Sequence, residues 1–368
     1  MSVQDEPGTH LSGPVLVVGT GLLGTSIGLG LRSRGVDVLL TDVSPSAAAV
    51  ARDIGAGRLL GEAPDAAPQL VVVAAPPDVT ARLAAQALAD FPDAVVVDIA
   101  SVKSVVAEEL RALGADLTRF VGTHPMAGRE KSGPVAARAQ LFAGAPWVIC
   151  AGPEALPGAV RAAEALAVDL GAVVVRLSAE EHDRSVALIS HLPQVMASLL
   201  ASRLQDTPGT ALALAGNGLR DTTRIAASDP GLWVQILSGN ASRLVEHLYG
   251  VREDLNRLIN TLENPAADGA RLDLAQLISE GNAGQARIPG KHGAPPQSFA
   301  TCTVLVDDTP GQIAKLLTEV GEIGVNLEDL RLEHSAGLQV GRAELSVLPS
   351  RLNGLVQELM NRGWKVVQ

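Results

Sequence analysis

The stretch PVLVVGTGLLGTSIGLGLRSRGVDVLLTD (residues 14–42) decides the fold of the N-terminal part of the chain. Its first apolar run, 14–20, leads into a glycine-rich turn and an apolar helical segment, and a second apolar run, 36–42, follows. Strands that are apolar along their whole length and alternate with helices are typical of a parallel sheet covered on both faces. The stretch therefore predicts a strand, a helix and a second strand of an α/β domain.

The same alternation continues to about residue 178. Further β-branched runs, with helical stretches between most of them, lie at 70–76, 94–100, 119–125, 146–152 and 172–178. We expect residues 1–177 to form a doubly wound, Rossmann-like domain with a parallel sheet.

The glycine-rich turn GTGLLG (residues 19–24) follows a strand and opens a helix, the setting in which G-x-G-x-x-G binds a dinucleotide. Asp42 ends the second run, where a carboxylate accepts a hydrogen bond from a ribose 2′-hydroxyl, and no arginine follows it, so NAD is favoured over NADP. A strand–turn–helix with a capping Asp is the alternative. The residues expected at NAD are Gly19, Gly21, Leu22, Leu23, Gly24, Asp42, Ala75 and Pro76.

From residue 178 the pattern becomes helical. Ser178 and Glu181 form a capping-box signature, and segments 179–204, 229–263 and 268–285 have apolar residues at helical spacing. The stripe of apolar residues from Leu244 to Leu262 is too extensive for one small bundle, which favours a homodimer. We expect residues 178–287 to be an all-α substrate and dimerisation domain.

A Pro/Gly-rich linker, 288–297, separates this region from the last part of the chain. Residues 298–368 read as strand, helix, two strands, helix and strand, which predicts a small α+β, ferredoxin-like domain.

Composition excludes several classes of protein. The net charge of −11 and an aromatic content of 2% argue against a nucleic-acid-binding protein. Cys150 and Cys302 match no metal spacing, so we expect free thiols, no metal and a cytoplasmic protein. No uninterrupted apolar run approaches the length of a membrane span, and the polar first residues resemble no signal peptide.

Two polar residues lie where ligands bind in open α/β sheets, beyond the carboxyl ends of strands. His124 lies at the end of the run 119–125 and suits the removal of a hydroxyl proton, although a structural histidine is the alternative. Ser101 follows the run 94–100 and, taken alone, is equally a helix N-cap.

The helical region holds a second group of candidates. Arg220 and Arg224 are four residues apart, which would place both on one helical face suited to a carboxylate; a solvated edge paired with Asp221 and Asp229 is the alternative. His191 precedes Pro193, which should disturb the helix there, and a packing histidine is its alternative reading.

In combination these motifs resemble the prephenate/arogenate dehydrogenase family of tyrosine biosynthesis. The resemblance covers about residues 13–285, through GTGLLG, DIASVKS, GTHPMAGREKSG, SHLPQ and GLRDTTRIAASDPGLW in the family's order. It implies NAD-dependent oxidative decarboxylation of prephenate, or of arogenate. It also implies catalytic roles for His124 and Ser101 and substrate-side roles for Arg224, Arg220, His191, Glu130 and Trp233.

Two departures bear on the substrate, because Gln194 and Asn217 stand where some members have His and Gly. A β-hydroxyacid dehydrogenase-like enzyme is one alternative. Such enzymes typically place a lysine or an aspartate of the helical domain at the reaction centre. Residues 179–285 contain no lysine, which disfavours the form with a lysine. The other alternative is a non-catalytic sensor of NAD and an amino acid.

The C-terminal part resembles an ACT regulatory domain, with Asp308-Thr309-Pro310-Gly311 similar to its DxPG turn. This resemblance implies feedback by an amino acid, for which we expect tyrosine. The residues expected at the effector are Asp308, Gly311 and Asn326.

Overall fold

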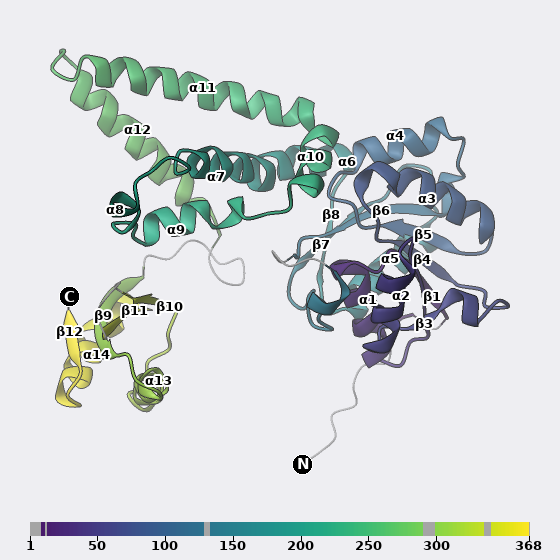
Figure 1. Ribbon diagram of the computed structural model, residues 1–368, viewed down its shortest axis with the longest axis horizontal. Helices are drawn as coiled ribbons and strands as arrows, with labels where there is room; N and C mark the ends of the chain where they lie inside the picture. Colours follow the sequence, from purple (N-terminus) through teal and green to yellow (C-terminus); the bar gives the residue numbers. More distant parts are fainter. Residues whose placement is uncertain (1–8, 12, 129–132, 290–298, 335–339, 368) are drawn as a thin grey trace. The chain divides into compact units, whose positions relative to one another are not determined.

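The computed structural model describes residues 9–11, 13–128, 133–289, 299–334 and 340–367 (Figure 1). The chain divides into two compact units, residues 1–205 with 222–252, and residues 206–221 with 253–368. Most of the expected linker 288–297 lies outside the described residues.

The first unit is built on an eight-stranded sheet with the order β3-β2-β1-β4-β5-β6-β7-β8. The expected strands are all present, and β3 is an additional short one. Strand bounds are β1 (Val15–Val18), β2 (Val38–Thr41), β3 (Arg58–Leu59), β4 (Leu70–Val73), β5 (Val95–Asp98), β6 (Phe120–Pro125), β7 (Pro146–Cys150) and β8 (Val173–Arg176). The doubly wound prediction is confirmed.

The expectation that the sheet is parallel throughout is wrong for one pair of neighbouring strands. Strand β7 runs antiparallel to β6, with His124 opposite Val148, while β8 is again parallel to β7. All other neighbouring strands of this sheet are parallel. The reason is the connection 126–145, whose described residues contain no α-helix to carry the chain back across the sheet.

Helices cover both faces of this sheet, as Figure 1 shows. One buried cluster joins α1 (Leu22–Ser33), α2 (Pro45–Asp53) and α5 (Pro157–Asp169) to one face. The other joins α3 (Pro77–Asp90) and α4 (Ser104–Ala112) to the opposite face. Short 3-10 turns are η1 (Leu60–Glu62), η2 (Leu117–Arg119) and η3 (Pro134–Ala136).

The expected helix 179–204 is interrupted. It consists of α6 (Ala179–Val186), a π-helical turn η4 (Ala187–His191) and α7 (Leu192–Ser202). The capping box predicted at Ser178 is present, since its hydroxyl accepts the Glu181 amide and the Glu181 carboxylate accepts the Ser178 amide. Proline lacks an amide hydrogen, and Pro193 lies two residues after the end of the π-turn, which accounts for the disturbed hydrogen bonding.

By length and composition alone, helix 179–202 could cross a membrane, with a mean hydropathy of 1.3 in its most apolar window. Its polar side chains favour the other reading, a helix of the protein core. His182 and Asp183 are buried in it and form hydrogen bonds within the protein.

The remaining helical elements include two long helices, α11 and α12. In chain order these elements are α8 (Gly209–Leu212), α9 (Asn217–Thr223), the 3-10 turn η5 (Arg224–Ala226), α10 (Pro230–Gly239), α11 (Ala241–Glu263) and α12 (Ala270–Gln285). The expected segment 229–263 is thus two helices, separated at the buried Asn240.

The C-terminal residues form a four-stranded antiparallel sheet with the order β10-β11-β9-β12 and a buried core of its own. Its elements are β9 (Ala300–Asp307), α13 (Gln312–Glu322), β10 (Asp329–His334), β11 (Val340–Val347), α14 (Pro349–Asn361) and β12 (Lys365–Val367). The predicted element order is confirmed. The expected strand 325–334 begins four residues later, so Asn326 lies in the preceding loop.

Candidate active site

The three glycines of the GTGLLG turn have three different surroundings. Gly19 has φ +102°, and a Cβ there would lie 2.3 Å from the carbonyl oxygen of Ala74. A Cβ on Gly24 would lie 2.0 Å from the carbonyl oxygen of Gly19, so helix α1 packs directly on the turn. Nothing lies within 4 Å of a Cβ on Gly21, so the backbone is open there to a ligand.

The N-terminus of α1 is suited to a pyrophosphate group. Its cap residue, Gly21, provides no side-chain hydrogen bond, and the first helical bond runs from the Thr25 amide to the Gly21 carbonyl. The amide hydrogens of residues 22–24 precede that bond. Uncapped amides at the positive end of a helix dipole favour an anionic ligand, so the turn fits a dinucleotide.

Asp42 lies directly after β2 and is held toward the same turn. Its carboxylate accepts the amide and the hydroxyl of Thr20, the latter at 2.8 Å, and the Ser44 amide at 2.8 Å. A carboxylate has about four acceptor positions, so one remains for a ribose hydroxyl. Ala75 and Pro76 lie in the short loop between β4 and α3, and both carbonyls accept the Thr80 hydroxyl.

Ser101 and His124 lie at the carboxyl ends of two adjacent strands. Strands β5 and β6 are paired with Asp98 opposite Gly122. Ser101 lies three residues after Asp98, and His124 lies two residues after Gly122. Both side chains are partly buried. The alternative reading of Ser101 as an N-cap is wrong, because α4 begins at Ser104 with Lys103 in the cap position.

His124 is the first member of a chain of hydrogen-bonded side chains. Its Nδ1 atom lies 2.8 Å from Nε2 of His182, and Nδ1 of His182 lies 2.8 Å from Oδ1 of Asp183. The two imidazole rings meet edge to face, with an interplanar angle of 74°. His182 is fully buried on α6, so α6 places a histidine and a carboxylate behind His124.

Asp183 also caps helix α4 from outside that helix. It accepts the Lys103 amide at 2.9 Å and the Ser104 amide at 2.8 Å. Burial raises the pKa of Asp183, but the hydrogen bonds from His182 and Ser104 outweigh burial and lower the pKa to about 2. Asp183 is therefore an ionised acceptor at neutral pH.

Lys103 is a second buried charge near His124. Its ammonium group forms an ion pair with Asp98 and donates to the carbonyl oxygen of Thr123 at 2.7 Å. Burial first, and then the charges of His182, Lys103 and His191, hold the pKa of His124 well below its usual value. His124 is therefore a neutral imidazole at neutral pH, the form that accepts a proton.

His191 lies in the π-turn η4 and is 1% exposed. Its ring packs edge to face against Trp233 of α10, with 6.1 Å between centroids, and its Nδ1 lies 3.3 Å from Nδ2 of Asn240. Burial lowers the pKa of His191 to about 4. Helix α10 approaches the Ser101 loop closely, because a Cβ on Gly239 would lie 3.2 Å from Val102.

Arg220 and Arg224 do not share one regular helix, so the prediction that both lie on one face of a helix is wrong. Helix α9 ends at Thr223, and Arg224 begins the 3-10 turn η5, which packs against α7. Both arginine side chains are exposed, and within the described part of the chain neither forms an ion pair with Asp221 or Asp229. Arg220 belongs to the second compact unit, and Glu130 lies outside the described residues.

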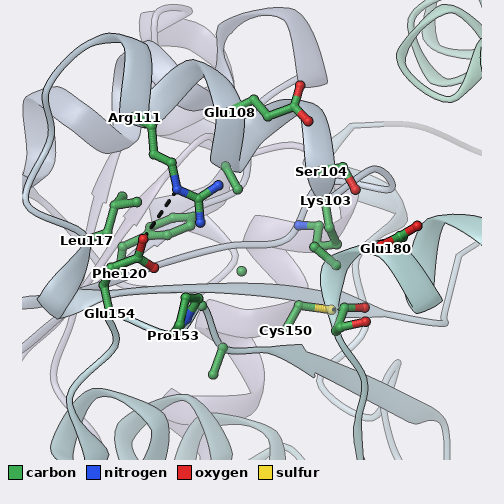
Figure 2. Close-up of a pocket in the computed structure, with 16 residues that line it drawn as sticks. Lys103, Ser104, Glu108, Arg111, Leu117, Phe120, Cys150, Pro153, Glu154 and Glu180 are labelled. Carbon is green, nitrogen blue, oxygen red and sulfur yellow. Dashed lines mark hydrogen bonds and ion pairs between the residues drawn. The ribbon is translucent and has the colours of Figure 1, made fainter.

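A cavity of about 230 Å³ lies between α4, the end of β7 with the loop that follows it, and the N-terminus of α6, and it is not the expected site (Figure 2). It is lined by Lys103, Cys150, Glu154 and Glu180, among others, and Arg111 pairs with Glu154 across it. Its carboxylates make it a poor site for a dianionic substrate. Burial raises the pKa of Cys150 to about 12, so this thiol is neutral and inert.

The expected effector residues lie at one end of the small sheet. Gly311 has φ +89° and is the N-cap of α13, with no side-chain cap. Asp308 is exposed in the turn before it. Asn326 is exposed and donates to Glu328 at 3.1 Å.

Sequence reasoning missed His182, Asp183, Lys103 and Asn240. A signal was available, because the His-Asp pair at 182–183 lies nine residues before His191 within the same predicted helical segment, 179–204. Charged and polar residues on the apolar side of a helix need partners when they are buried.

Comparisons with known proteins agree with this geometry. Residues 27–176 match the family model "Prephenate dehydrogenase, nucleotide-binding domain", and residues 178–279 match "Prephenate dehydrogenase, dimerization domain". A probable prephenate dehydrogenase of Streptomyces niveus (NovF) is 36% identical over 356 residues, 95% of this chain and 98% of the relative.

Solved structures give the same result. Prephenate dehydrogenase from Aquifex aeolicus, in complex with hydroxyphenyl propionate and NAD+, has a TM-score of 0.65 at 28% identity, over 75% of this chain and 99% of that one. Synechocystis arogenate dehydrogenase has a TM-score of 0.60 at 26% identity, over 73% and 99% of the two chains. The glycine turn, the Asp42 carboxylate and these matches together show that the chain belongs to the prephenate dehydrogenase family and is an NAD-dependent oxidoreductase.

Proposed function

We propose that the chain converts prephenate to 4-hydroxyphenylpyruvate, with His124 as the acceptor of the hydroxyl proton. The observation that supports this role is the position of His124. It lies at the carboxyl end of β6, as a neutral imidazole, at the same sheet edge as the GTGLLG turn.

The reaction needs few groups from the protein. The substrate is a cyclohexadienol, and the carbinol carbon loses its hydrogen with the electron pair while the hydroxyl loses a proton. NAD supplies the hydride acceptor. His124 takes the proton, the carbinol carbon becomes a ketone, and loss of CO₂ makes the ring aromatic. The remaining task of the protein is to orient the substrate and to bind its carboxylates.

We assign the other residues as follows. Ser101 lies near the reacting hydroxyl, and Arg224 binds a substrate carboxylate by charge-assisted hydrogen bonds. Substrate-side roles for His191, Trp233 and Arg220 follow from the family resemblance alone, as does that of Glu130, which lies outside the described residues. The cofactor is held by Gly19, Gly21, Leu22, Leu23, Gly24, Asp42, Ala75 and Pro76.

The test is an assay of NADH formation by the full chain with prephenate and with arogenate. Turnover with prephenate, and its loss in His124→Asn at unchanged NAD affinity, supports the proposal. Faster turnover with arogenate would assign the chain to arogenate instead, a reading favoured by its similarity to the Synechocystis enzyme. NAD binding without turnover of either compound would indicate a sensor.

A homodimer is part of the proposal. In the second unit Leu255, Ile259 and Leu262 of α11 and Leu272 and Ile278 of α12 are all at least 44% exposed. Apolar side chains gathered on two helices indicate a protein interface. Arg257 joins the two helices through Asp273, at 2.7 Å, so they present these side chains together. Sedimentation of the full chain tests this assignment.

Three further assignments remain proposals. The domains are 1–177, 178–287 and 298–368, with a linker at 288–297. The protein is cytoplasmic, in keeping with two buried free thiols, Cys150 and Cys302. Residues 298–368 bind tyrosine through Asp308, Gly311 and Asn326, and inhibit the enzyme.

A further inference from the structure

We propose that His182 and Asp183 are positioning residues that fix the tautomer of His124, so that Nδ1 of His124 carries the hydrogen and Nε2 is the atom that receives the substrate's proton. This inference rests on the proposed role of His124 as proton acceptor. It adds the reason why one ring nitrogen, and not the other, performs that role.

The ionised carboxylate of Asp183 can only accept hydrogen bonds. Its Oδ1 accepts the Lys103 amide and its Oδ2 accepts the Ser104 amide, at 2.9 and 2.8 Å. Both amides are fixed at the N-terminus of α4, which favours a negative charge. A carboxylate held by two backbone amides has no hydrogen to donate to His182.

His182 lies between Asp183 and His124 in the hydrogen-bonded chain. Because Asp183 accepts, Nδ1 of His182 carries the hydrogen of their 2.8 Å contact. In the neutral ring the other nitrogen, Nε2, then has a free lone pair. His182 is fully buried, and its contacts on both sides are made within the protein.

The same reasoning fixes His124. Its Nδ1 faces Nε2 of His182 at 2.8 Å, so Nδ1 must donate, and Nε2 of the neutral ring must be bare. The edge-to-face contact of the two rings, 5.1 Å between centroids, fixes the orientation as well. A histidine with its proton on the wrong nitrogen cannot act as a base, which makes the tautomer a requirement for turnover.

Other charged groups face this pair from each element packed around it. They are Asp98 on β5, Lys103 before α4, Asp183 on α6 and His191 in the π-turn η4. Lys103 and Asp98 are paired with each other. Asp183 is therefore the carboxylate that remains to balance a positive charge on the two histidines.

This arrangement also accommodates the proton after the reaction. When the substrate O–H bond breaks, an N–H bond forms at Nε2 of His124, and the ring becomes an imidazolium. Its Nδ1 hydrogen still points at His182. That hydrogen is either shared or passed to Nε2 of His182, which places the charge beside Asp183.

The tautomer is measured directly by nitrogen NMR of the full chain with ¹⁵N-labelled histidine. The His124 signals are assigned by their absence in His124→Asn. We expect a hydrogen on Nδ1 of His124 and none on Nε2. If the neutral ring of His124 instead carries its hydrogen on Nε2, this measurement alone overturns the proposal, and no variant of His182 is needed.

Two variants of His182 separate positioning from packing. The side-chain oxygen of His182→Gln can accept from His124 and its amide group can donate to Asp183, whereas His182→Leu can do neither. We expect His182→Leu to lose about 100-fold or more in kcat, with the KM values for NAD and prephenate within about threefold. His182→Gln should recover at least tenfold of that loss. His247→Leu, on α11 outside the hydrogen-bonded chain, is the matched control.

The double variant completes the test. If His182 acts through His124, then His124→Asn with His182→Leu loses no more turnover than His124→Asn alone. If the turnover losses of His124→Asn and His182→Leu multiply in the double variant, His182 has a structural role and the proposal is overturned. Equal losses of turnover in His182→Gln and His182→Leu would have the same meaning. Wild-type turnover in His124→Asn would instead reject the proposed role of His124 as proton acceptor, on which this inference rests, whatever the His182 variants do.

Discussion

The ammonium nitrogen of Lys103 lies 2.7 Å from the carbonyl oxygen of Thr123, the residue that precedes His124. The same ammonium forms an ion pair with Asp98, so one buried cation joins the ends of β5 and β6. The Lys103 backbone amide is bound by Asp183. Lys103 thus connects the strand that carries His124 to the carboxylate behind His182, and it places a positive charge near the imidazole of His124.

We predict that Lys103→Met destabilises the protein by about 3–5 kcal/mol, because it leaves the Asp98 carboxylate buried without its counter-ion. Denaturant unfolding measures the loss. The double variant with Asp98→Asn should regain part of it. In the folded fraction, the acid limb of kcat/KM should move to higher pH, since Lys103 contributes to the low pKa of His124. An unfolding midpoint equal to that of the parent would contradict the prediction.

Arg224→Ala should raise the KM for prephenate by about one to two orders of magnitude, because it removes a charge-assisted contact worth about 1.5–3 kcal/mol. The KM for NAD should stay constant, because the glycine turn and Asp42 are unaltered. Arg203→Ala, an arginine on the same unit after α7, is the comparison. An unchanged KM for prephenate would show that Arg224 is an ordinary surface residue.

Asp42→Ser should narrow the preference for NAD over NADP. The carboxylate accepts from Thr20 and Ser44 and would repel a 2′-phosphate, whereas a serine hydroxyl would not. The measurement is kcat/KM for both cofactors, in the parent and in the variant. A parent enzyme that prefers NADP would refute this assignment of Asp42.

The sequence was sufficient to predict the parts of the site that depend on local pattern. The GTGLLG turn is one, because the spacing of its glycines between a strand and a helix is a local pattern, and the close contact of Gly24 with the carbonyl oxygen of Gly19 lies within that same unit. The direction of β7 could not be read from its own residues, since a buried strand is apolar whichever way it runs. The contact between His124 and His182 joins residues 58 apart, and periodicity shows that a helix has a buried side but not what it faces.

Stability should fall between pH 6.5 and pH 4 because of His124 and His191. Burial lowers the pKa of His191 to about 4 and holds that of His124 well below its usual value, whereas both titrate near 6.5 when unfolded. The unfolded chain therefore binds more protons in this range. Their contribution is fully present above about pH 6.5 and is lost as the pH falls, by about 1.4 kcal/mol per pH unit for each histidine.

Denaturant unfolding of the full chain at several values between pH 7 and pH 4.5 measures this slope. His191→Gln should show a shallower decline, because one of the two histidines is absent. Asp183 does not interfere, since its pKa of about 2 makes it lose its contribution only at lower pH. A stability that is constant or rises toward pH 4.5 would be the contrary result.

The last prediction is that tyrosine binds residues 298–368 and inhibits the enzyme. The N-terminus of α13 begins at Gly311 without a side-chain cap, and nothing lies within 4 Å of a Cβ there, so a ligand carboxylate can approach the helix amides. Asn326 is exposed in the loop before β10 and donates a hydrogen bond to Glu328 of the same loop. Strands β10 and β12 are the edges of the sheet, so pairing of two such sheets would cover an edge and build a shared site.

Calorimetry of the full chain with tyrosine, and turnover with prephenate at increasing tyrosine, test this prediction together. Asn326→Ala should weaken binding and inhibition in parallel and leave turnover without tyrosine unchanged. Asn361→Ala, at the end of α14, removes an exposed asparagine that bonds Gln357 and should change neither. If millimolar tyrosine (about −4 kcal/mol of binding free energy) neither binds nor slows the enzyme, the C-terminal sheet has only a structural role, as a module that pairs with its copy.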